Sequence, residues 1–341
     1  MRVLMLGGTV FLGRHVVETL LARGHEVTLF HRGKRGGELF PNVERVLGDR
    51  TTDLDRLPKG ATWDAVVDTC GFVPGAVAAS ARALRERAGT YVFISSISVH
   101  DVSQRHVDES TPALELPDGA SRDVMTPDTY GALKYLCEQE AIAAFGPDRT
   151  FVVRPGLIVG PHDPSDRFTY WPLRFARGGD VLVPDALDMP VQYIDVRDLA
   201  AFVVDAIERG HTGVVNTVGP PKRTTLGALL AACAAASDSD ANAVPVDRAF
   251  LRRWNAGPWI DLPVWSEDGF EYDGITRTDP SRGIALGLRH RPVEETIADT
   301  LRWARHERGD APLKAGLTPA REAALFALAA HESATAVLPS R

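Results

Sequence analysis

Short apolar segments alternate with longer helix-like segments through the first 160 residues of the chain. The apolar segments predict six strands, at residues 2–6, 26–30, 43–47, 63–68, 90–94 and 151–155. Most of the segments between them have apolar residues at helical spacing or are rich in alanine. Nearly continuous apolar strands are typical of a parallel sheet that helices cover on both faces. The pattern therefore predicts an α/β fold with a doubly wound parallel sheet.

The first predicted strand ends in a glycine-rich turn. Gly7, Gly8 and Thr9 form the turn, and Gly13 opens an amphipathic segment. The outer glycines are spaced as in the motif Gly-x-x-Gly-x-x-Gly, but Val10 holds the middle position. Such a turn lets a pyrophosphate lie against backbone N–H groups at a helix N-terminus. It predicts dinucleotide binding, with a plain strand-turn-helix unit as the alternative.

A basic segment, His31 to Gly36, follows the second predicted strand. NAD sites commonly place an acidic residue here, where it binds the ribose 2′-hydroxyl. No Asp or Glu stands between residues 27 and 37, whereas Arg32, Lys34 and Arg35 do. A guanidinium can bind a 2′-phosphate through paired hydrogen bonds, and a carboxylate would repel it. The sequence therefore favours NADP(H) over NAD(H). For Lys34 and Arg35, the alternative is that they lie in a solvated loop without a cofactor contact.

The later strands end in small or polar residues. Asp49 follows the third strand and is suited either to accept a hydrogen bond from adenine or to cap a helix. Gly71 follows the fourth strand and allows close backbone approach, and Ser96 follows the fifth. Ligands of doubly wound sheets bind beyond the carboxyl ends of the strands. These residues converge there with Arg32 and the glycine turn, which predicts a cofactor site at this edge.

Tyr130 and Lys134 are spaced to lie on one face of a predicted helix. This helix follows a proline-interrupted surface loop at residues 101–128. An ammonium beside a phenol favours the phenolate and lowers its pKa from about 10. The pair can then exchange a proton with a substrate oxygen near neutral pH. Because the spacing is common, a surface pair is the alternative, but the preceding serine-rich strand end favours catalysis.

The alternation of strands and helices changes after the sixth strand. A helix over 195–209 and a strand over 213–218 indicate that the chain returns to the sheet. The predicted domains are a nucleotide-binding domain (1–160 and 191–219), a substrate domain (161–190 and 220–332) and a tail (333–341). A helix predicted at Pro319 to His331 either packs on the substrate domain or forms a dimer interface.

Aromatic residues gather in two segments of the predicted substrate domain. Phe168, Tyr170 and Trp171 suit a flat or apolar ligand, with burial in a core as the alternative. The second segment, at 250–275, contains Trp254, Trp259, Trp265, Phe270 and Tyr272. It also favours either substrate selection or a small aromatic core. The acidic and histidine side chains at 162–166 match no strong metal pattern, so no metal site is predicted.

Composition and charge exclude several classes of protein. The hydrophobic content of 44% and charged content of 24% are ordinary for a globular chain of 341 residues. A net charge of −7 counts against nucleic-acid binding by phosphate neutralisation. Three cysteines without a close pair fit a reducing compartment. Because a strand starts at residue 2 and no apolar run reaches about 18 residues, we expect no leader, no membrane span and a cytoplasmic location.

Six stretches together resemble the extended branch of the short-chain dehydrogenase/reductase superfamily over residues 1–305. They are LGGTVFLG, FISSISV, YGALK, VRPGLIVGP, VQYIDVRDLA and GVVNTVGP. The best-known members of this branch are nucleotide-sugar epimerases and dehydratases. The opening GGTVFLGRH is similar to that of a bacterial subgroup of reductases or epimerase/dehydratase-like proteins, and to that of plant chloroplast stem-loop RNA-binding proteins. The resemblance implies a Rossmann domain with a smaller, discontinuous C-terminal α/β substrate domain.

The resemblance also implies roles for individual residues. The catalytic residues would be Ser96, which binds the substrate oxygen, Tyr130, which exchanges its proton, and Lys134, which binds the nicotinamide ribose. The cofactor-binding residues would be Gly7, Thr9, Val10, Phe11, Leu12, Gly13, Arg32, Asp49, Arg50, Gly71, Lys134 and Pro155. The substrate-binding residues would be Phe72, Ser98, His100, Tyr170 and Trp171.

Two departures from the family pattern bear on the substrate. His100-Asp101 stands where sugar-nucleotide enzymes often have Tyr-Gly. Gln192 lies in the segment where sugar-nucleotide epimerases place an arginine on the substrate diphosphate. Loss of that cation removes charge-assisted hydrogen bonds, which disfavours a sugar nucleotide.

We therefore predict an NADP(H)-dependent oxidoreductase that transfers hydride to or from a carbonyl or alcohol carbon, with ketone reduction favoured. The alternatives are a nucleotide-sugar epimerase or dehydratase with tightly bound NAD(P), and a non-catalytic RNA-binding protein. The intact catalytic set and the acidic charge count against RNA binding. The expected partner is a small aromatic or apolar molecule, with no nucleic acid and no membrane, and a homodimer is left open.

Overall fold

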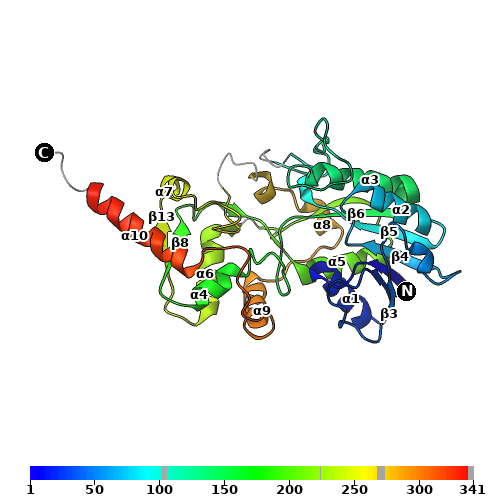
Figure 1. Cartoon of the computed structure of the whole chain (residues 1–341), viewed down its shortest axis with the longest axis horizontal. Helices are drawn as coiled ribbons and strands as arrows, with labels where there is room; N and C mark the ends of the chain where they lie inside the picture. The colour runs from blue at the N-terminus through cyan, green and yellow to red at the C-terminus, as the bar shows by residue number, and fades with distance from the viewer. Residues whose placement is uncertain (102–103, 105, 223, 267–272, 337–341) are drawn as a thin grey trace. The chain divides into compact units, whose positions relative to one another are not determined.

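A computed structural model describes residues 1–101, 104, 106–222, 224–266 and 273–336. The chain divides into two compact units (Figure 1). Unit 1 comprises Met1–Ile158, Gln192–Pro221 and Arg277–His290. Unit 2 comprises Val159–Val191, Lys222–Thr276 and Arg291–Arg341.

Unit 1 contains a seven-stranded parallel sheet with the order β11-β6-β5-β4-β1-β2-β3. The strands are β1 (Arg2–Leu6), β2 (Glu26–His31), β3 (Glu44–Leu47), β4 (Trp63–Asp68), β5 (Ala88–Ile94), β6 (Thr150–Pro155) and β11 (Gly213–Thr217). Strands β2 and β3 lie on one side of β1, and β4, β5, β6 and β11 lie on the other. Such a reversal creates a crevice at the carboxyl ends of the central strands. The predicted doubly wound α/β fold is confirmed.

Helices cover both faces of this sheet, as Figure 1 shows. They are α1 (Phe11–Ala22) and α5 (Val196–Arg209) on one face, and α2 (Pro74–Leu84) and α3 (Tyr130–Phe145) on the other. The buried residues Val3 and Met5 of β1 belong to the core that contains α1 and α5. Their neighbours Leu4 and Leu6 belong to the core under α2 and α3. Burial on both faces explains why the strand lacks polar alternation.

Helix α5 is defined by signals in its own sequence. The Asp195 carboxylate accepts a hydrogen bond from the Arg197 backbone N–H at 2.8 Å and caps the N-terminus. Gly210 adopts a left-handed conformation with φ of 66° and ends the helix. Capping and a left-handed glycine satisfy backbone groups that a helix end leaves unpaired.

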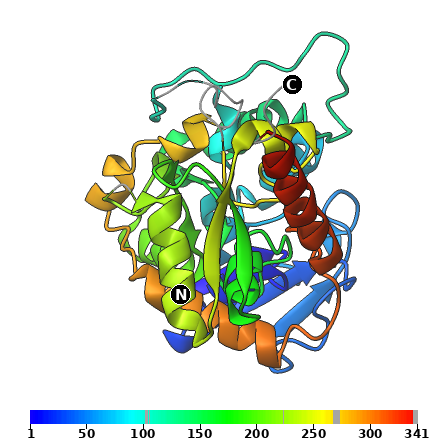
Figure 2. The ribbon, with the colours of Figure 1, turned by 90° about the vertical axis from the view of Figure 1, so that its left-hand side faces the viewer.

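Unit 2 contains a parallel pair of strands, β8 (Asp180–Pro184) and β13 (Asn242–Val246), seen side by side in Figure 2. A second, antiparallel pair joins β9 (Pro190–Val191) and β12 (Thr224–Thr225). The helices of this unit are α4 (Tyr170–Ala176), α6 (Leu226–Ser237), α7 (Arg248–Arg253), α9 (Val293–His306) and α10 (Pro319–Ala336). A buried ion pair links two of them, because Arg174 Nε lies 2.7 Å from Glu322 Oε2.

Residues 277–290 belong to a different part of the fold from the one predicted, because the sequence placed them in the substrate domain. They include the short helix α8 (Ser281–Ala285) and belong to unit 1. Leu288 is part of the core of unit 1, and Leu286 packs against that core. His290 Nε2 also lies 3.0 Å from the carbonyl oxygen of Val218. These contacts join segments far apart in the sequence, which a linear pattern does not reveal.

The C-terminal helix is longer than predicted. It extends to Ala336, whereas the sequence placed a tail from residue 333. Residues 337–341, and the predicted aromatic residues Phe270 and Tyr272, lie outside the described residues.

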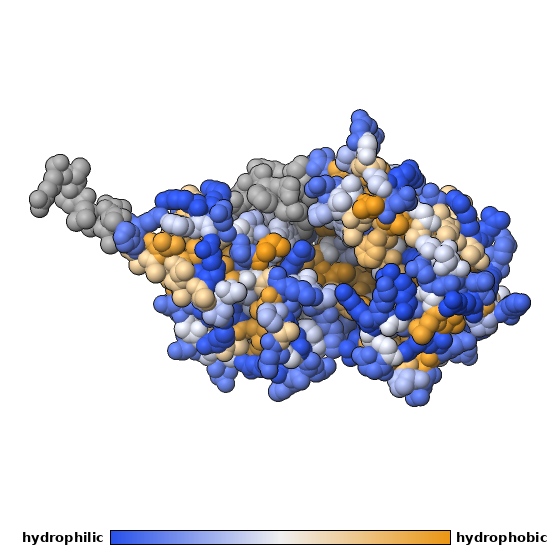
Figure 3. Space-filling model, in the orientation of Figure 1, coloured by the Kyte–Doolittle hydropathy of each residue, from blue (hydrophilic) through white to orange (hydrophobic). Residues whose placement is uncertain are grey.

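Hydrophilic side chains cover most of the face seen in Figure 3. Within the described part of the chain, no helix combines the length and the hydropathy needed to span a bilayer. The three cysteines are free, and Cys137 and Cys233 are buried.

Candidate active site

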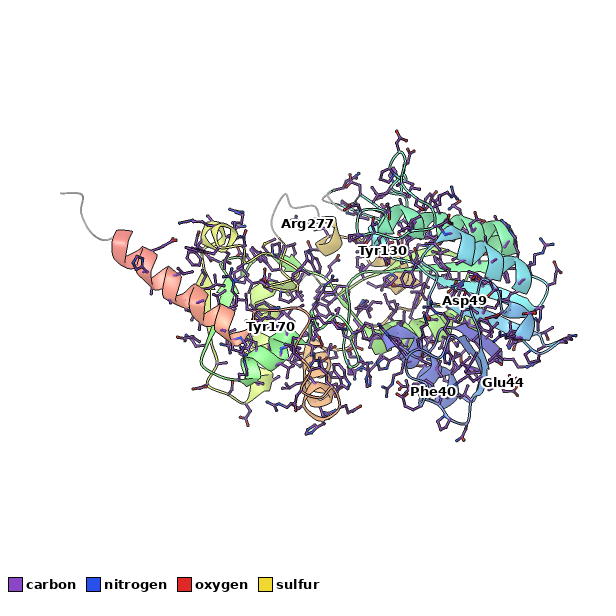
Figure 4. The ribbon with its side chains drawn as sticks, viewed as in Figure 1. Phe40, Glu44, Asp49, Tyr130, Tyr170 and Arg277 are labelled. Carbon is purple, nitrogen blue, oxygen red and sulfur yellow. The ribbon has the colours of Figure 1, made fainter. Side chains whose placement is uncertain are left out.

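A cavity of about 920 Å³ lies in unit 1 at the carboxyl ends of the strands. Its lining includes the predicted cofactor residues Gly7, Thr9, Val10, Phe11, Leu12, Gly13, Arg32, Asp49, Arg50, Lys134 and Pro155. Ser96, Tyr130 and Phe72 also line it. Tyr130, from α3, and Asp49, from the segment after β3, are labelled in Figure 4. The structure thus brings together most of the residues that the sequence selected.

The glycine turn has a backbone that side chains would disrupt. Gly7 and Gly8 have φ values of 100° and 92°. A Cβ on Gly7 would lie 2.5 Å from Thr69 Oγ1, and a Cβ on Gly13 would lie 3.0 Å from Gly8 Cα. Val10 has an ordinary extended φ of −132°, so the middle position tolerates a side chain.

The N-terminus of α1 is suited to bind an anion. Among the described residues, no side chain caps this end of the twelve-residue helix, and its first turn carries no acidic residue. Backbone N–H groups at a helix start and the positive end of the helix dipole favour a phosphate. The glycine turn and this helix end therefore fit the pyrophosphate of a dinucleotide.

Lys134 is buried beneath the cavity. Its Nζ donates hydrogen bonds to the carbonyl oxygens of Gly71, at 2.8 Å, and Ile94, at 2.6 Å. Burial lowers the pKa of Lys134 to about 8. Gly71 does not line the cavity, so its contribution is this carbonyl rather than the direct cofactor contact that was predicted. The two carbonyls fix the lysine at the ends of β4 and β5.

Tyr130 begins α3 one turn before Lys134. Burial raises the pKa of Tyr130, and its hydrogen bond with Ser96 acts in the opposite direction. From the sequence, we expected the charge of Lys134 to lower the pKa of Tyr130 below its usual value. This expectation is wrong for the protein without a bound cofactor. The ammonium of Lys134 is directed to backbone carbonyls. At neutral pH, Tyr130 is therefore a protonated phenol that can donate its proton.

Ser96 and Ser98 are linked beside this phenol. Ser96 Oγ lies 3.1 Å from Ser98 Oγ and accepts a hydrogen bond from the Ser98 backbone N–H, also at 3.1 Å. Gly131 allows the first turn of α3 to reach this segment, because a Cβ there would lie 1.9 Å from the Ser98 carbonyl oxygen. The sequence reasoning missed Gly131, although its place directly after the candidate tyrosine is a usable signal.

The predicted cofactor residue Arg50 has another partner. Its Nη1 and Nη2 lie 2.7 and 2.5 Å from the carboxylate of Asp68, which also accepts a hydrogen bond from Tyr91 Oη at 2.8 Å. Burial alone would raise the pKa of Asp68, but the Arg50 guanidinium holds it below its usual range. Arg50 lines the cavity, but its guanidinium is bound to the sheet, which corrects the predicted cofactor contact of this side chain. Sequence reasoning missed Asp68 as its partner.

His100 is a structural residue, which corrects its predicted role in substrate binding. Its side chain is 0% exposed, and its Nε2 lies 3.0 Å from Arg154 Nη1. The same guanidinium pairs with Glu138, one turn beyond Lys134, at 2.9 and 2.6 Å. This buried group joins β6 to α3 and holds the helix that carries the candidate catalytic residues.

Tyr170 and Trp171 are also structural, in contrast to the prediction that they bind substrate. They are 1% and 0% exposed and lie in the core of unit 2. Trp171 Nε1 donates to the Pro263 carbonyl oxygen at 2.7 Å. A Cβ on Gly316 would lie 1.9 Å from the Tyr170 ring, so this ring is covered by backbone. Tyr170 is labelled in Figure 4.

Gln192, from the segment where an arginine was expected for a sugar-nucleotide epimerase, has a backbone partner. Its side chain is buried and pairs with the backbone of Thr278 at both ends: Nε2 donates to the carbonyl oxygen at 2.8 Å, and Oε1 accepts from the N–H at 2.9 Å. The glutamine holds residues 277–290 in unit 1 and carries no charge for a diphosphate. In the described part of the chain, no group of three His, Cys, Asp or Glu side chains is arranged to hold a metal ion.

A glycine turn that fits a pyrophosphate and a Ser–Tyr–Lys set in one cavity are the features expected of an NAD(P)-dependent oxidoreductase of the short-chain dehydrogenase/reductase type. The sequence pattern of the NAD dependent epimerase/dehydratase family matches residues 3–219. The chain therefore belongs to this family.

The similar proteins include oxidoreductases and a protein named only as a member of the epimerase family. The epimerase family protein SDR39U1 of Bos taurus is 25% identical over 250 residues, which cover 66% of this chain and 76% of that protein. The sterol-4-alpha-carboxylate 3-dehydrogenase (decarboxylating) of Bos taurus is 30% identical over 48% of each chain. The 2-alkyl-3-oxoalkanoate reductase of Stenotrophomonas maltophilia is 32% identical over 48% of this chain and 52% of that protein.

Solved structures support the fold. The Bordetella bronchiseptica enzyme WbmH, in complex with NAD+, has a TM-score of 0.65 and 20% identity, covering 90% of this chain and 98% of its own. A UDP-glucose 4-epimerase from Bifidobacterium longum, in complex with NAD+ and UDP, has a TM-score of 0.62 and 18% identity, covering 90% and 99%. At these identities the likeness extends to the fold alone.

Proposed function

We propose that this protein is an NADP(H)-dependent ketoreductase that acts on a small organic carbonyl compound. The observation that carries the proposal is the place of Tyr130 in the cavity beside Ser96, with Lys134 one turn further along α3. Burial raises the pKa of this phenol, so it is an acid at neutral pH. An acid at this position suits reduction, in which the substrate oxygen gains a proton.

Each residue of the Ser–Tyr–Lys set has a distinct task. The nicotinamide cofactor, when bound, supplies the hydride. The Ser96 hydroxyl donates a hydrogen bond to the substrate carbonyl oxygen and orients it. Tyr130 Oη transfers its proton to that oxygen as negative charge develops. Lys134, whose Nζ is held by two backbone carbonyls, would bind the ribose hydroxyls next to the nicotinamide.

The proposed preference for NADP(H) follows from the charge near the end of β2. Arg32, Lys34 and Arg35 all line the cavity. Asp49 also lines it, but its carboxylate accepts hydrogen bonds from Thr51 N, at 3.0 Å, and Thr51 Oγ1, at 2.7 Å. A 2′-phosphate would meet three cations at this end of the cavity, and a guanidinium among them can bind it with two hydrogen bonds.

A sugar-nucleotide substrate is disfavoured by Gln192. Its amide is already paired with the Thr278 backbone. A diphosphate placed there would meet a neutral group whose hydrogen bonds are satisfied. Phe72 contributes an apolar face to the cavity and is 44% exposed, which suits an aromatic or apolar substrate instead.

Net consumption of cofactor separates the proposed reductase from an epimerase. Purified protein is incubated with NADPH or NADH and a panel of small aliphatic and aromatic ketones, and loss of NADPH is compared with alcohol formed. One NADPH lost for each alcohol, with slower turnover on NADH, supports the proposal. Conversion of a UDP-sugar without net cofactor loss would identify an epimerase instead. A marked preference for NADH would refute the cofactor assignment.

A further inference from the structure

Three buried side chains from separate segments of unit 1 form one hydrogen-bonded group, which we call the Arg154 cluster. Its members are His100, Glu138 and Arg154, which are 0%, 0% and 5% exposed. The Arg154 guanidinium donates through Nε and Nη2 to the two carboxylate oxygens of Glu138, at 2.9 and 2.6 Å. Its Nη1 lies 3.0 Å from His100 Nε2. None of the three residues lines the cavity, so they can act on a bound ligand only through other side chains.

The charge of Arg154 determines how His100 takes part in the cluster. A guanidinium only donates hydrogen bonds, so His100 Nε2 accepts and the ring hydrogen resides on Nδ1. Burial, and then the charge of Arg154, lower the pKa of His100, which keeps the ring neutral at neutral pH. The cluster thus joins one cation, one anion and one neutral acceptor. Loss of the acceptor would leave a buried N–H of a charged group unpaired, which costs free energy.

His100 connects the cluster to the segment that carries Ser96. It directly follows the short helical turn Ile97–Val99, and its backbone N–H donates to the Ile97 carbonyl oxygen at 3.1 Å. Ser96 precedes the same turn, where its Oγ accepts a hydrogen bond from the Ser98 backbone N–H at 3.1 Å. Ser96 and His100 are therefore the two ends of one short, internally bonded segment.

Glu138 connects the cluster to α3. Tyr130, Lys134 and Glu138 are spaced four residues apart, so they lie along one side of this helix. The first turn of α3 already lies against the serine segment, because a Cβ on Gly131 would lie 1.9 Å from the Ser98 carbonyl oxygen. The cluster makes a second connection roughly two turns further along the helix. Two separated connections fix the rotation of the serine segment against α3, whereas a single contact would leave it free to pivot.

We propose that Arg154 is a positioning residue that holds the Ser96 hydroxyl against Tyr130 Oη, through His100 on one side and Glu138 on the other. In the proposed reduction both hydroxyl groups must reach one substrate oxygen, so the inference rests on the proposed function. A misplacement of about 1 Å can slow such a reaction about 10²-fold. The hydrogen bond from Ser96 also acts on the pKa of Tyr130, in the direction opposite to burial. The contact between the two side chains can therefore be followed without a substrate.

NMR spectra of the full-length protein with isotopically labelled tyrosine follow this contact without cofactor. The ring Cζ signal responds to hydrogen bonding of the phenol, and the Tyr130 signal is identified by its absence from Tyr130→Phe. Ser96→Ala gives the reference position without the hydrogen bond. His100→Phe and His100→Leu remove the acceptor of Arg154 and should move the signal towards that reference. His100→Gln supplies an acceptor oxygen at a similar reach and should restore the native position.

Kinetic constants of the same variants measure the consequence for the reaction. The kcat for ketone reduction should fall about ten- to hundredfold in His100→Phe and His100→Leu, with less than about twofold change in the NADPH dissociation constant. His100→Gln should recover most of the lost kcat. Phe145→Leu is the control, because Phe145 is 3% exposed at the far end of α3 and lies outside the cluster. It should lower the melting temperature but leave kcat and the Tyr130 signal unchanged.

Melting temperatures show which variants fold, and either folded variant without the acceptor, His100→Phe or His100→Leu, is sufficient for the test. A native Tyr130 signal together with a native kcat in that variant overturns the inference. An equal loss of kcat in Phe145→Leu also overturns it, because the effect then belongs to the stability of α3. If the native protein reduces no ketone, the proposed function is wrong, and the Tyr130 signal alone decides whether the cluster holds Ser96 in place.

Discussion

Replacement of Asp68 by Asn is expected to destabilise the protein strongly, because Arg50 then keeps its charge in a buried site without a counterion. Asp68 is 0% exposed and accepts hydrogen bonds from two nitrogens of Arg50 and from Tyr91 Oη. Asn has nearly the shape of Asp, so the substitution creates no cavity. The measured change therefore reports the loss of the charge together with the loss of one acceptor oxygen, because an amide nitrogen cannot accept from Arg50 or Tyr91.

Removal of one partner from a buried ion pair costs about 3–5 kcal/mol. For a unit of this size, that loss lowers the melting temperature by roughly 6–20 °C. The pKa of Asp68 is lowered in the folded state. Its stabilising contribution is therefore complete above the unfolded-state pKa and is lost as the pH falls through the folded-state pKa. The difference between the two proteins should shrink accordingly in acid.

Calorimetric unfolding without cofactor, at several pH values, measures this difference. Glu140→Gln is the matched control, because Glu140 pairs at 3.3 Å with Arg82, whose side chain is 69% exposed. That variant should stay within about 0.5 kcal/mol of the native protein. A loss of less than about 1 kcal/mol for Asp68→Asn at neutral pH would refute the reasoning.

Three further variants or reagents test other parts of the structure. Gly13→Ala places a Cβ 3.0 Å from Gly8 Cα. In a fluorescence titration, this variant should bind NADPH about tenfold more weakly, which corresponds to the loss of one hydrogen bond to phosphate. Unchanged affinity would count against the phosphate site. Trp171→Ala should cost about 3–5 kcal/mol of unfolding free energy without changing NADPH affinity; a stable variant with altered substrate KM would restore its predicted role. Burial raises the pKa of Cys70 to about 11. Alkylation of Cys70 by iodoacetamide should therefore be slow at neutral pH and accelerate about tenfold per pH unit as the pH approaches that pKa. Rapid labelling of Cys70 at neutral pH would contradict this prediction.

The sheet and the phosphate end of the site follow from local sequence patterns. The central strand β1 is a nearly uninterrupted apolar run because both of its faces are buried, as the two cores on either side of it demonstrate. The glycine turn requires backbone conformations that only glycine adopts easily, so Gly7 and Gly8 are visible in the sequence. Tyr130 and Lys134 are predictable because four-residue spacing puts both on one helix face.

The directions of long polar side chains did not follow from the sequence. Arg50 stands after β3, where a cofactor contact was reasonable, yet its partner Asp68 comes from β4, eighteen residues later. His100 was assigned to substrate, but Arg154 from β6 holds it in the interior. Burial and pairing between distant segments determine these outcomes, and neither is a property of a local pattern.

The Tyr130 pKa was mispredicted for the same reason. Proximity on a helix suggested that the lysine charge would act on the phenol. Lys134 Nζ instead donates to carbonyls of Gly71 and Ile94, which come from the ends of two strands. Desolvation of the phenol then dominates.

The central claim is that Tyr130 supplies the proton in an NADPH-dependent reduction. The most direct test is the kcat of Tyr130→Phe for ketone reduction, measured beside the NADPH dissociation constant, with Tyr135→Phe on the same helix as the control. We expect kcat to fall about 10²- to 10⁴-fold while NADPH binding and the control change little. Full activity in the Tyr130→Phe variant would contradict this mechanism.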